Sequence, residues 1–248
     1  MKRAFIRAIW GDVSKNGIRN GKMSKDIQLI KENPYNEPFV VYVFGSENYE
    51  ELTRQGFECK LIDELPVKYD VELNFWRHKL DIFKYAMEDF DEIVFLDWDC
   101  RPTKKLPDDF WERMSKKAVF QANLFQYRTK RCLWRKEEWR KTCNGGFVYM
   151  ADKSIPQEII NIYDELCKWV DEKRELRKSK GQELRFREKI IIFDDEPAMS
   201  KYVDNLTDGW LGADYYWENY EPEFCNVKRS AYSQELLKEK DECFFHLV

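Results

Sequence analysis

The sequence predicts an α/β fold with a parallel sheet and helices between its strands. Apolar runs of the length of buried strands alternate with amphipathic or polar stretches over the first hundred residues. This alternation is typical of a Rossmann-like arrangement. The chain has 248 residues, which suffices for a sizeable core, and it has no internal repeat or low-complexity linker. We therefore expect a single domain.

The first half of the chain supplies most of the expected sheet. Strands are expected at residues 4–10, 39–44, 59–62 and 93–96, and helices at 47–54 and 75–87. In the second helix, apolar residues recur with the spacing of an amphipathic helix at Trp76, Leu80, Phe83 and Met87.

The second half of the chain is less regular. Strands are expected at 118–124 and 146–150, and helices at 155–170, entered through Pro156, and at 198–203. Residues 172–189 are almost entirely charged, which fits either a solvated extension of the preceding helix or a mobile loop. The chain ends in a short apolar run at 244–248.

The composition gives no reason to expect a nucleic-acid partner. Lys and Arg number 42 against 46 Asp and Glu, so the formal charge is −4. Aromatic residues make up 16% of the chain, and nine of them are tryptophans. Such rings serve as stacking platforms in sugar-binding sites, but the composition favours the simpler explanation that they fill a bulky core.

The cysteines and the lack of an address signal indicate a cytoplasmic protein. The seven cysteines are irregularly spaced and form no Cys-x-x-Cys pair, which favours free thiols in a reducing compartment and disfavours a zinc cluster. The apolar run at residues 1–10 is too short for a signal peptide, and no stretch approaches a transmembrane segment in length.

The most informative motif is Asp97-Trp98-Asp99, which directly follows the apolar run 93–96. Two carboxylates at the carboxyl end of a buried strand lie at the edge of an α/β sheet, where ligands usually bind. Such oxygens are suitable ligands for Mg²⁺ or Mn²⁺, and a divalent cation held there can neutralise a diphosphate. The alternative is an ordinary acidic turn at the end of a strand.

Further motifs occur before and after this one. Together with Asp97-Trp98-Asp99 they resemble those of GT-A fold glycosyltransferases, especially the glycogenin-like enzymes of glycosyltransferase family 8. The matching segments follow the family's order and span most of the chain: Lys79-Leu80, Ile93 to Leu96, Asp97-Trp98-Asp99, Cys143-Asn144-Gly145-Gly146-Phe147, Asp194 to Met199, and His246.

The resemblance implies a mixed sheet flanked by helices, with a nucleotide-binding half at 1–100 and an acceptor-side half at 101–248. It implies metal-dependent transfer of a sugar from a nucleoside-diphosphate sugar, most plausibly a UDP-sugar, to a glycan, protein or small-molecule acceptor. The metal ligands it implies are Asp97, Asp99 and His246, with Asp97 touching either the metal or the ribose. An imidazole ligand suits Mn²⁺ better than Mg²⁺. His246 is alternatively a chance residue in a frayed chain end.

The resemblance also implies where the donor binds. The nucleobase is expected beside Ala8, Trp10 and Asp12 at the end of the first strand, where Trp10 could stack on uracil. Further residues are expected around the phosphates and the sugar: Lys79, Trp98, Asn144 and Gly145. The alternatives are that Lys79 is a solvated helical residue and that Asn-Gly-Gly is an ordinary turn. His78, in contrast, is expected to be structural or solvated.

Asp195 and Glu196 are the expected catalytic carboxylates. One of them would deprotonate the acceptor in an inverting reaction, whereas in a retaining reaction a group there would stabilise an oxocarbenium-like centre. Alternatively, Asp194 or Asp195 merely caps the following helix. Glu196 stands where the family has Gln, and the chain lacks the Gly and Lys-Pro-Trp positions that follow the family's late His. The stereochemistry therefore does not follow from the resemblance.

Two rival functions remain open. Strand-Asp-x-Asp also begins haloacid dehalogenase-type phosphatases, but there the motif lies on the first strand, and Arg101 occupies a position that such enzymes fill with Thr or Val. The other rival is a non-catalytic module that binds a glycan or polyanion through the basic, tryptophan-bearing segment 128–140.

Overall fold

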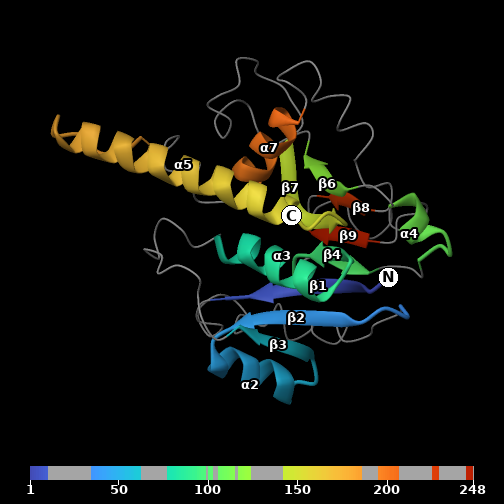
Figure 1. Cartoon of the computed structure of the whole chain (residues 1–248). Coiled ribbons are helices and arrows are strands. Elements are labelled where there is room, and N and C mark those ends of the chain that lie inside the picture. The colour runs from blue at the N-terminus through green and yellow to red at the C-terminus, as the bar shows by residue number, and fades with distance from the viewer. Residues whose placement is uncertain are drawn as a thin grey trace.

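The structure is a computed structural model, and it describes residues 1–10, 35–62, 77–98, 100–102, 106–114, 117–123, 142–185, 195–206, 225–228 and 244–247. At its centre lies a six-stranded mixed sheet with the strand order β3-β2-β1-β4-β7-β6 (Figure 1). These strands are β1 (Arg3–Ile9), β2 (Phe39–Phe44), β3 (Glu58–Ile62), β4 (Glu92–Leu96), β6 (Ala118–Asn123) and β7 (Thr142–Met150).

The sheet has a parallel half and an antiparallel half. Strand β1 pairs in parallel with β2 and β4, and β2 with β3. Strand β7 runs antiparallel to both β4 and β6. The described residues therefore confirm the predicted α/β fold with a mixed sheet and flanking helices, and the four parallel strands form its Rossmann-like part.

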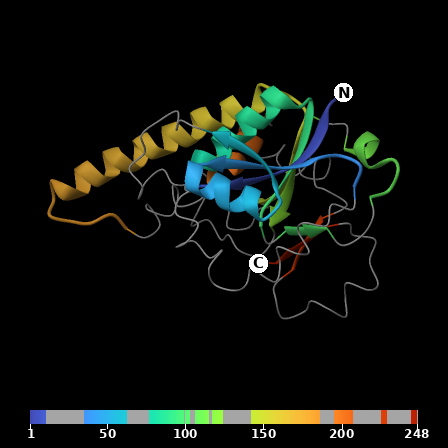
Figure 2. The same cartoon turned by 90° about the horizontal axis from the view of Figure 1, so that it is seen from below.

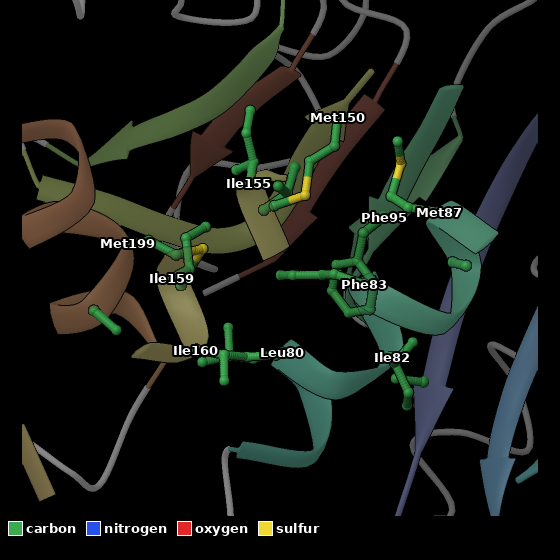
Figure 3. Packing of buried hydrophobic residues seen from close by; sticks show 14 of the residues in the cluster. Leu80, Ile82, Phe83, Met87, Phe95, Met150, Ile155, Ile159, Ile160 and Met199 are labelled. Atoms are coloured by element: carbon green, nitrogen blue, oxygen red, sulfur yellow. The ribbon is translucent and has the colours of Figure 1, made fainter. Parts of the chain in front are cut away.

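Three helices cover one face of the sheet: α3 (Arg77–Asp89), α5 (Ile155–Lys178) and α7 (Glu196–Asn205). Their apolar side chains pack on the inward-facing residues of the strands, as Figure 3 shows for Phe83 of α3 against Phe95 of β4. Ile159 of α5 and Met199 of α7 belong to the same fully buried cluster. Burial of this apolar surface is the main stabilising contribution to the fold.

Side chains on β1 alternate between the two faces of the sheet, as the pleat requires. Ala4, Ile6 and Ala8 belong to the cluster under α3 and α5, whereas Phe5 belongs to a second cluster on the opposite face. The short helix α4 (Phe110–Arg113) contributes Phe110 and Trp111 to that second cluster. Helix α2 (Ser46–Arg54) packs beside β2 and β3 at the other end of the sheet (Figure 1).

A second, smaller sheet has the strand order β5-β9-β8. Its strands are β5 (Cys100–Pro102), β8 (Cys225–Lys228) and β9 (Phe244–Leu247). β5 follows the Asp-x-Asp motif, so this sheet brings the last described strand of the chain to the site suggested by the sequence.

Helix α5 extends well past the edge of the sheet (Figure 2). It continues without a break through the charged stretch to Lys178, so the helix-extension alternative holds as far as that residue, and residues 179–185 continue without helix. Its outer turns are exposed and charged. A helix segment that packs against no other element is stable in water when its surface is polar on every side. Among the described residues, no helix is both long and apolar enough to cross a membrane.

Most of the expected elements are present, and their boundaries differ from the expected ones by at most four residues, apart from the extension of α5. Strand β7 begins at Thr142 instead of residue 146, because its first residues pair with β6 beyond an irregularity in the ladder. β5 and α4, which the sequence did not indicate, have only three and four residues, too few to show a periodic pattern.

Candidate functional site

The candidate site lies where β4 ends. The amide of Asp97 donates a hydrogen bond of 2.9 Å to the carbonyl of Gly146, which continues the pairing of β4 with β7 by one residue. Beyond that point the Cys100 amide donates to the Asp97 carbonyl at 2.9 Å and closes a turn that leads into β5. The side chain of Asp97 is 31% exposed, so it faces an accessible edge of the sheet.

Lys79 is the residue that joins the parts of the site. Its ammonium is buried, with Nζ lying 3.1 Å from Asp97 Oδ1, 3.2 Å from Asp97 Oδ2 and 3.0 Å from Asp195 Oδ2. Helix α3 supplies the lysine, while one carboxylate follows β4 and the other precedes α7. The alternative of a solvated helical lysine is therefore wrong.

The charge state of Lys79 follows from its surroundings. Burial by itself lowers the pKa of the ammonium, but the carboxylates of Asp195 and Asp97 outweigh that effect and hold the pKa above its ordinary value. The lysine therefore stays positively charged at neutral pH. A fixed positive charge between two carboxylate side chains holds both of them in place through the ion pairs at 3.0 and 3.1 Å.

Gly145 lies against this ion pair. A Cβ atom added to Gly145 would lie 2.5 Å from Lys79 Nζ and 2.6 Å from Asp195 Oδ2, closer than any side chain tolerates. The ladder between β6 and β7 jumps here, because Phe120 pairs with Val148 while Gln121 pairs with Asn144. Such a bulge redirects a strand locally, and here it brings backbone close to Lys79. The side chain of Asn144 lies outside the described residues.

Asp195 occupies the N-cap position of α7, but its side chain makes no capping hydrogen bond. It is 2% exposed and points to Lys79 instead. Among the described residues, its Oδ2 has no aligned hydrogen bond besides this ion pair. A buried carboxylate oxygen with spare acceptor capacity is suited to a ligand hydroxyl. Glu196, the first residue of α7, is also buried.

The C-terminal strand comes close to the Asp-x-Asp turn. In the small sheet, Cys100 pairs with His246, which places the backbone of His246 opposite the residue that follows Asp99. His246 therefore lies in a paired strand and not in a frayed chain end. The side chain of His246 and all of Asp99 lie outside the described residues.

The end of β1 holds two of the residues expected at the nucleobase. Ala8 is buried and its carbonyl accepts a hydrogen bond of 2.7 Å from Trp98 Nε1. The ring of Trp10 lies nearly parallel to that of His78, with 6.3 Å between centroids and 9° between planes. His78 thus has a packing role, as expected, and Asp12 lies outside the described residues.

The described residues fit a divalent cation in part. Asp97 supplies one accessible carboxylate, and the register of β5 with β9 places the backbone of His246, another expected ligand, opposite Cys100. No group of three or more His, Cys, Asp or Glu side chains that could hold a metal occurs within the described ranges. The expected ligand set therefore depends on two side chains outside those ranges.

Sequence reasoning missed two residues that shape the site. Arg7 is fully buried on β1 and donates hydrogen bonds to the turn after Asp97. Ser200 of α7 accepts a hydrogen bond of 3.0 Å from the Cys143 amide and ties α7 to β7. A charged residue inside an otherwise apolar strand was the available signal for Arg7, whereas nothing in the sequence distinguishes Ser200 from other helical serines.

No protein-family model matches the sequence, and no curated protein is significantly similar to it.

Proposed function

We propose that the chain is a metal-dependent glycosyltransferase that takes its sugar from a nucleoside-diphosphate sugar, most plausibly a UDP-sugar. The observation that carries the proposal is the convergence of Asp97, Lys79, Gly145 and Asp195 at one edge of the sheet. These four residues come from four separate motifs of the sequence. An acidic turn without a function requires no such convergence.

The proposed cation site consists of Asp99 and His246, with Asp97 beside them. Mn²⁺ or Mg²⁺ held there would neutralise the charge that develops on a departing nucleoside diphosphate. Both oxygens of Asp97 lie within 3.2 Å of Lys79 Nζ, which orients this carboxylate. In this proposal Lys79 acts mainly as an internal counter-ion that orients Asp97 and Asp195, and less as a direct phosphate ligand.

The proposed role of Asp195 is at the sugar. Its buried Oδ2 has acceptor capacity for a sugar hydroxyl, and Gly145 lets the backbone of β7 approach without a side chain in between. Glu196 stands next to it as the second carboxylate. Trp10, Ala8 and Asp12 remain the proposed nucleobase site, with Trp98, Asn144 and Gly145 nearer the phosphates and sugar.

The partners follow from this chemistry. The donor is a nucleotide sugar, and the acceptor is a glycan, a protein or a small molecule. The balanced charge of −4 still argues against a nucleic-acid partner. We place the protein in the cytoplasm because its cysteine pattern favours a reducing compartment.

The test is donor hydrolysis and transfer with a panel of UDP- and GDP-sugars in Mn²⁺. Wild type is expected to release nucleoside diphosphate, and Asp99→Ala is expected to lose both reactions while keeping its circular dichroism spectrum. Near-normal turnover by Asp99→Ala in Mn²⁺ would show that the cation site is misassigned. Release of inorganic phosphate from sugar phosphates would instead favour the phosphatase alternative.

A further inference from the structure

Arg7 is a buried charge on the face of the sheet that α3, α5 and α7 do not cover. It lies between Phe5 and Ile9 on that face of β1, and its exposed fraction is 0%. A buried guanidinium is costly unless its donors are used. Its contacts therefore indicate what it is for.

The two terminal nitrogens of Arg7 reach both ends of one turn. Nη1 donates to the carbonyl of Asp97 at 2.6 Å, and Nη2 donates to the carbonyl of Cys100 at 2.8 Å. The guanidinium also lies over the rings of Phe39 and Trp98, with Cζ 5.3 Å from each centroid. A guanidinium has several N–H donors fixed in one plane, so it can bond to both carbonyls at once. A lysine has a single nitrogen and is less suited to two acceptors in fixed positions.

Trp98 ties the same turn to β1 a second time. Its Nε1 donates to the Ala8 carbonyl at 2.7 Å, one residue along the strand from Arg7. Its ring meets Phe57 edge to face, with 6.0 Å between centroids. The side chain between the two aspartates is therefore fixed by the strand and the core and is not free to rotate.

We propose that Arg7 and Trp98 brace the turn from Asp97 to Cys100 in its final shape before any cation binds. Arg7 is then a positioning residue, which acts on the Asp97 carboxylate through the backbone of the turn. The brace itself rests on the contacts described here, and only its effect on cation affinity rests on the proposed function. Because the turn is already ordered, cation binding carries a smaller entropic cost of ordering the chain, and the affinity is correspondingly higher.

The brace is tested by hydrogen exchange of the Cys100 amide in protein treated with chelator. That amide donates to the Asp97 carbonyl, so its exchange reports opening of the turn. Arg7→Met is expected to speed the exchange by at least about tenfold. Trp98→Phe, which keeps an aromatic ring but removes the Nε1 donor, is expected to speed it by a smaller factor. If Arg7→Met fails to fold, Trp98→Phe alone decides.

Arg3→Met is the matched control. Arg3 lies on the same strand and also contacts β4, through a 2.6 Å ion pair with Glu92, but it is partly exposed and does not touch the turn. Its loss is expected to leave exchange at Cys100 unchanged. The proposal would be overturned if the Cys100 amide exchanged at the wild-type rate in Arg7→Met and Trp98→Phe. It would also be overturned if Arg3→Met accelerated the exchange as much as they do.

Mn²⁺ titration followed by electron paramagnetic resonance separates positioning from mere stability. Loss of a residue that supports metal ligands typically weakens the affinity by about 10- to 100-fold, and we expect this of Arg7→Met but not of Arg3→Met. Unchanged Mn²⁺ affinity in Arg7→Met would contradict its positioning role. A wild-type chain that takes up no Mn²⁺ but shows the expected exchange pattern would refute the proposed function and leave the brace standing.

Discussion

Lys79 shows how a single residue connects the fold to the proposed chemistry. A lysine that is 1% exposed would be strongly unfavourable in an apolar core, and here the carboxylates of Asp97 and Asp195 stabilise its charge. The sequence indicated Lys79 only through a family resemblance. Its burial could not be predicted, because the spacing of apolar residues along a helix does not show which other segments of the chain pack against it.

The ion pair of Lys79 predicts a specific loss of stability. Lys79→Met leaves Asp195 buried beside an apolar group, and we expect the free energy of unfolding at pH 7 to fall by about 3 kcal/mol in urea titrations. The double variant Lys79→Met/Asp195→Asn is expected to lose less than the single variant. Lys84→Met, on the exposed side of the same helix, is the control and should stay within about 0.5 kcal/mol of wild type. Equal losses in Lys84→Met and Lys79→Met would contradict the account.

Gly145 predicts a loss of the same kind. Its missing Cβ leaves room for Lys79 Nζ and Asp195 Oδ2, so Gly145→Ala is expected to displace the ion pair and lower the stability by about 2 kcal/mol. Because the pair is then already disturbed, Lys79→Met should cost less in the Gly145→Ala background than in wild type. Additive losses in this double-mutant cycle, measured by urea unfolding, would show that the two residues do not interact.

At the scale of elements, α3 and α5 are joined by a partly buried ion pair as well as by apolar packing. Arg77 donates to Asp81 at 3.1 Å and also pairs with Asp164 of α5. Burial raises the pKa of Asp81 to about 6, although Arg77 opposes the shift. The sequence pattern predicted both helices but not this contact, because charged residues on amphipathic helices usually face water.

The raised pKa of Asp81 predicts a pH dependence of stability. The folded chain holds this proton up to about pH 6, whereas the unfolded chain releases it near pH 3.8, so the contribution is present at low pH and is lost as the pH rises through 6. Relative to Asp81→Asn, wild type should therefore lose about 1 kcal/mol of stability between pH 5 and pH 8.

Urea unfolding of both proteins at the two pH values measures this difference. Glu88→Gln, a carboxylate-to-amide change at an exposed position of the same helix, is the control for the substitution itself. A wild-type-to-Asp81→Asn difference that is equal at pH 5 and pH 8 would show that Asp81 does not titrate in this range.

The elements also show what a sequence can predict. The parallel strands and α3, α5 and α7 were predictable, because each has enough residues for a periodic or continuous apolar pattern. The small sheet was not predictable. Its pairing of Cys100 with His246 joins residues that are far apart in the chain, and the two strands that contain them have only three and four residues. The order of the strands was not predicted, because an apolar pattern does not specify which strands become neighbours.

At the scale of the whole molecule, the fold brings the residues of the candidate site together where β4 ends. The parallel half supplies Arg7 and Asp97, α3 supplies Lys79, and the antiparallel half with α7 supplies Gly145 and Asp195. The small sheet then brings the backbone of His246 to the same turn. Ligand sites at the carboxyl ends of parallel strands are a general property of such sheets.

The most direct measurement is a calorimetric titration of UDP and other nucleoside diphosphates, with and without Mn²⁺, into wild type, Asp99→Asn and His246→Ala. The account predicts that wild type binds a nucleoside diphosphate only with the cation, that Asp99→Asn loses this binding, and that His246→Ala needs more Mn²⁺. Binding of equal strength without a divalent cation, or in Asp99→Asn, would contradict it.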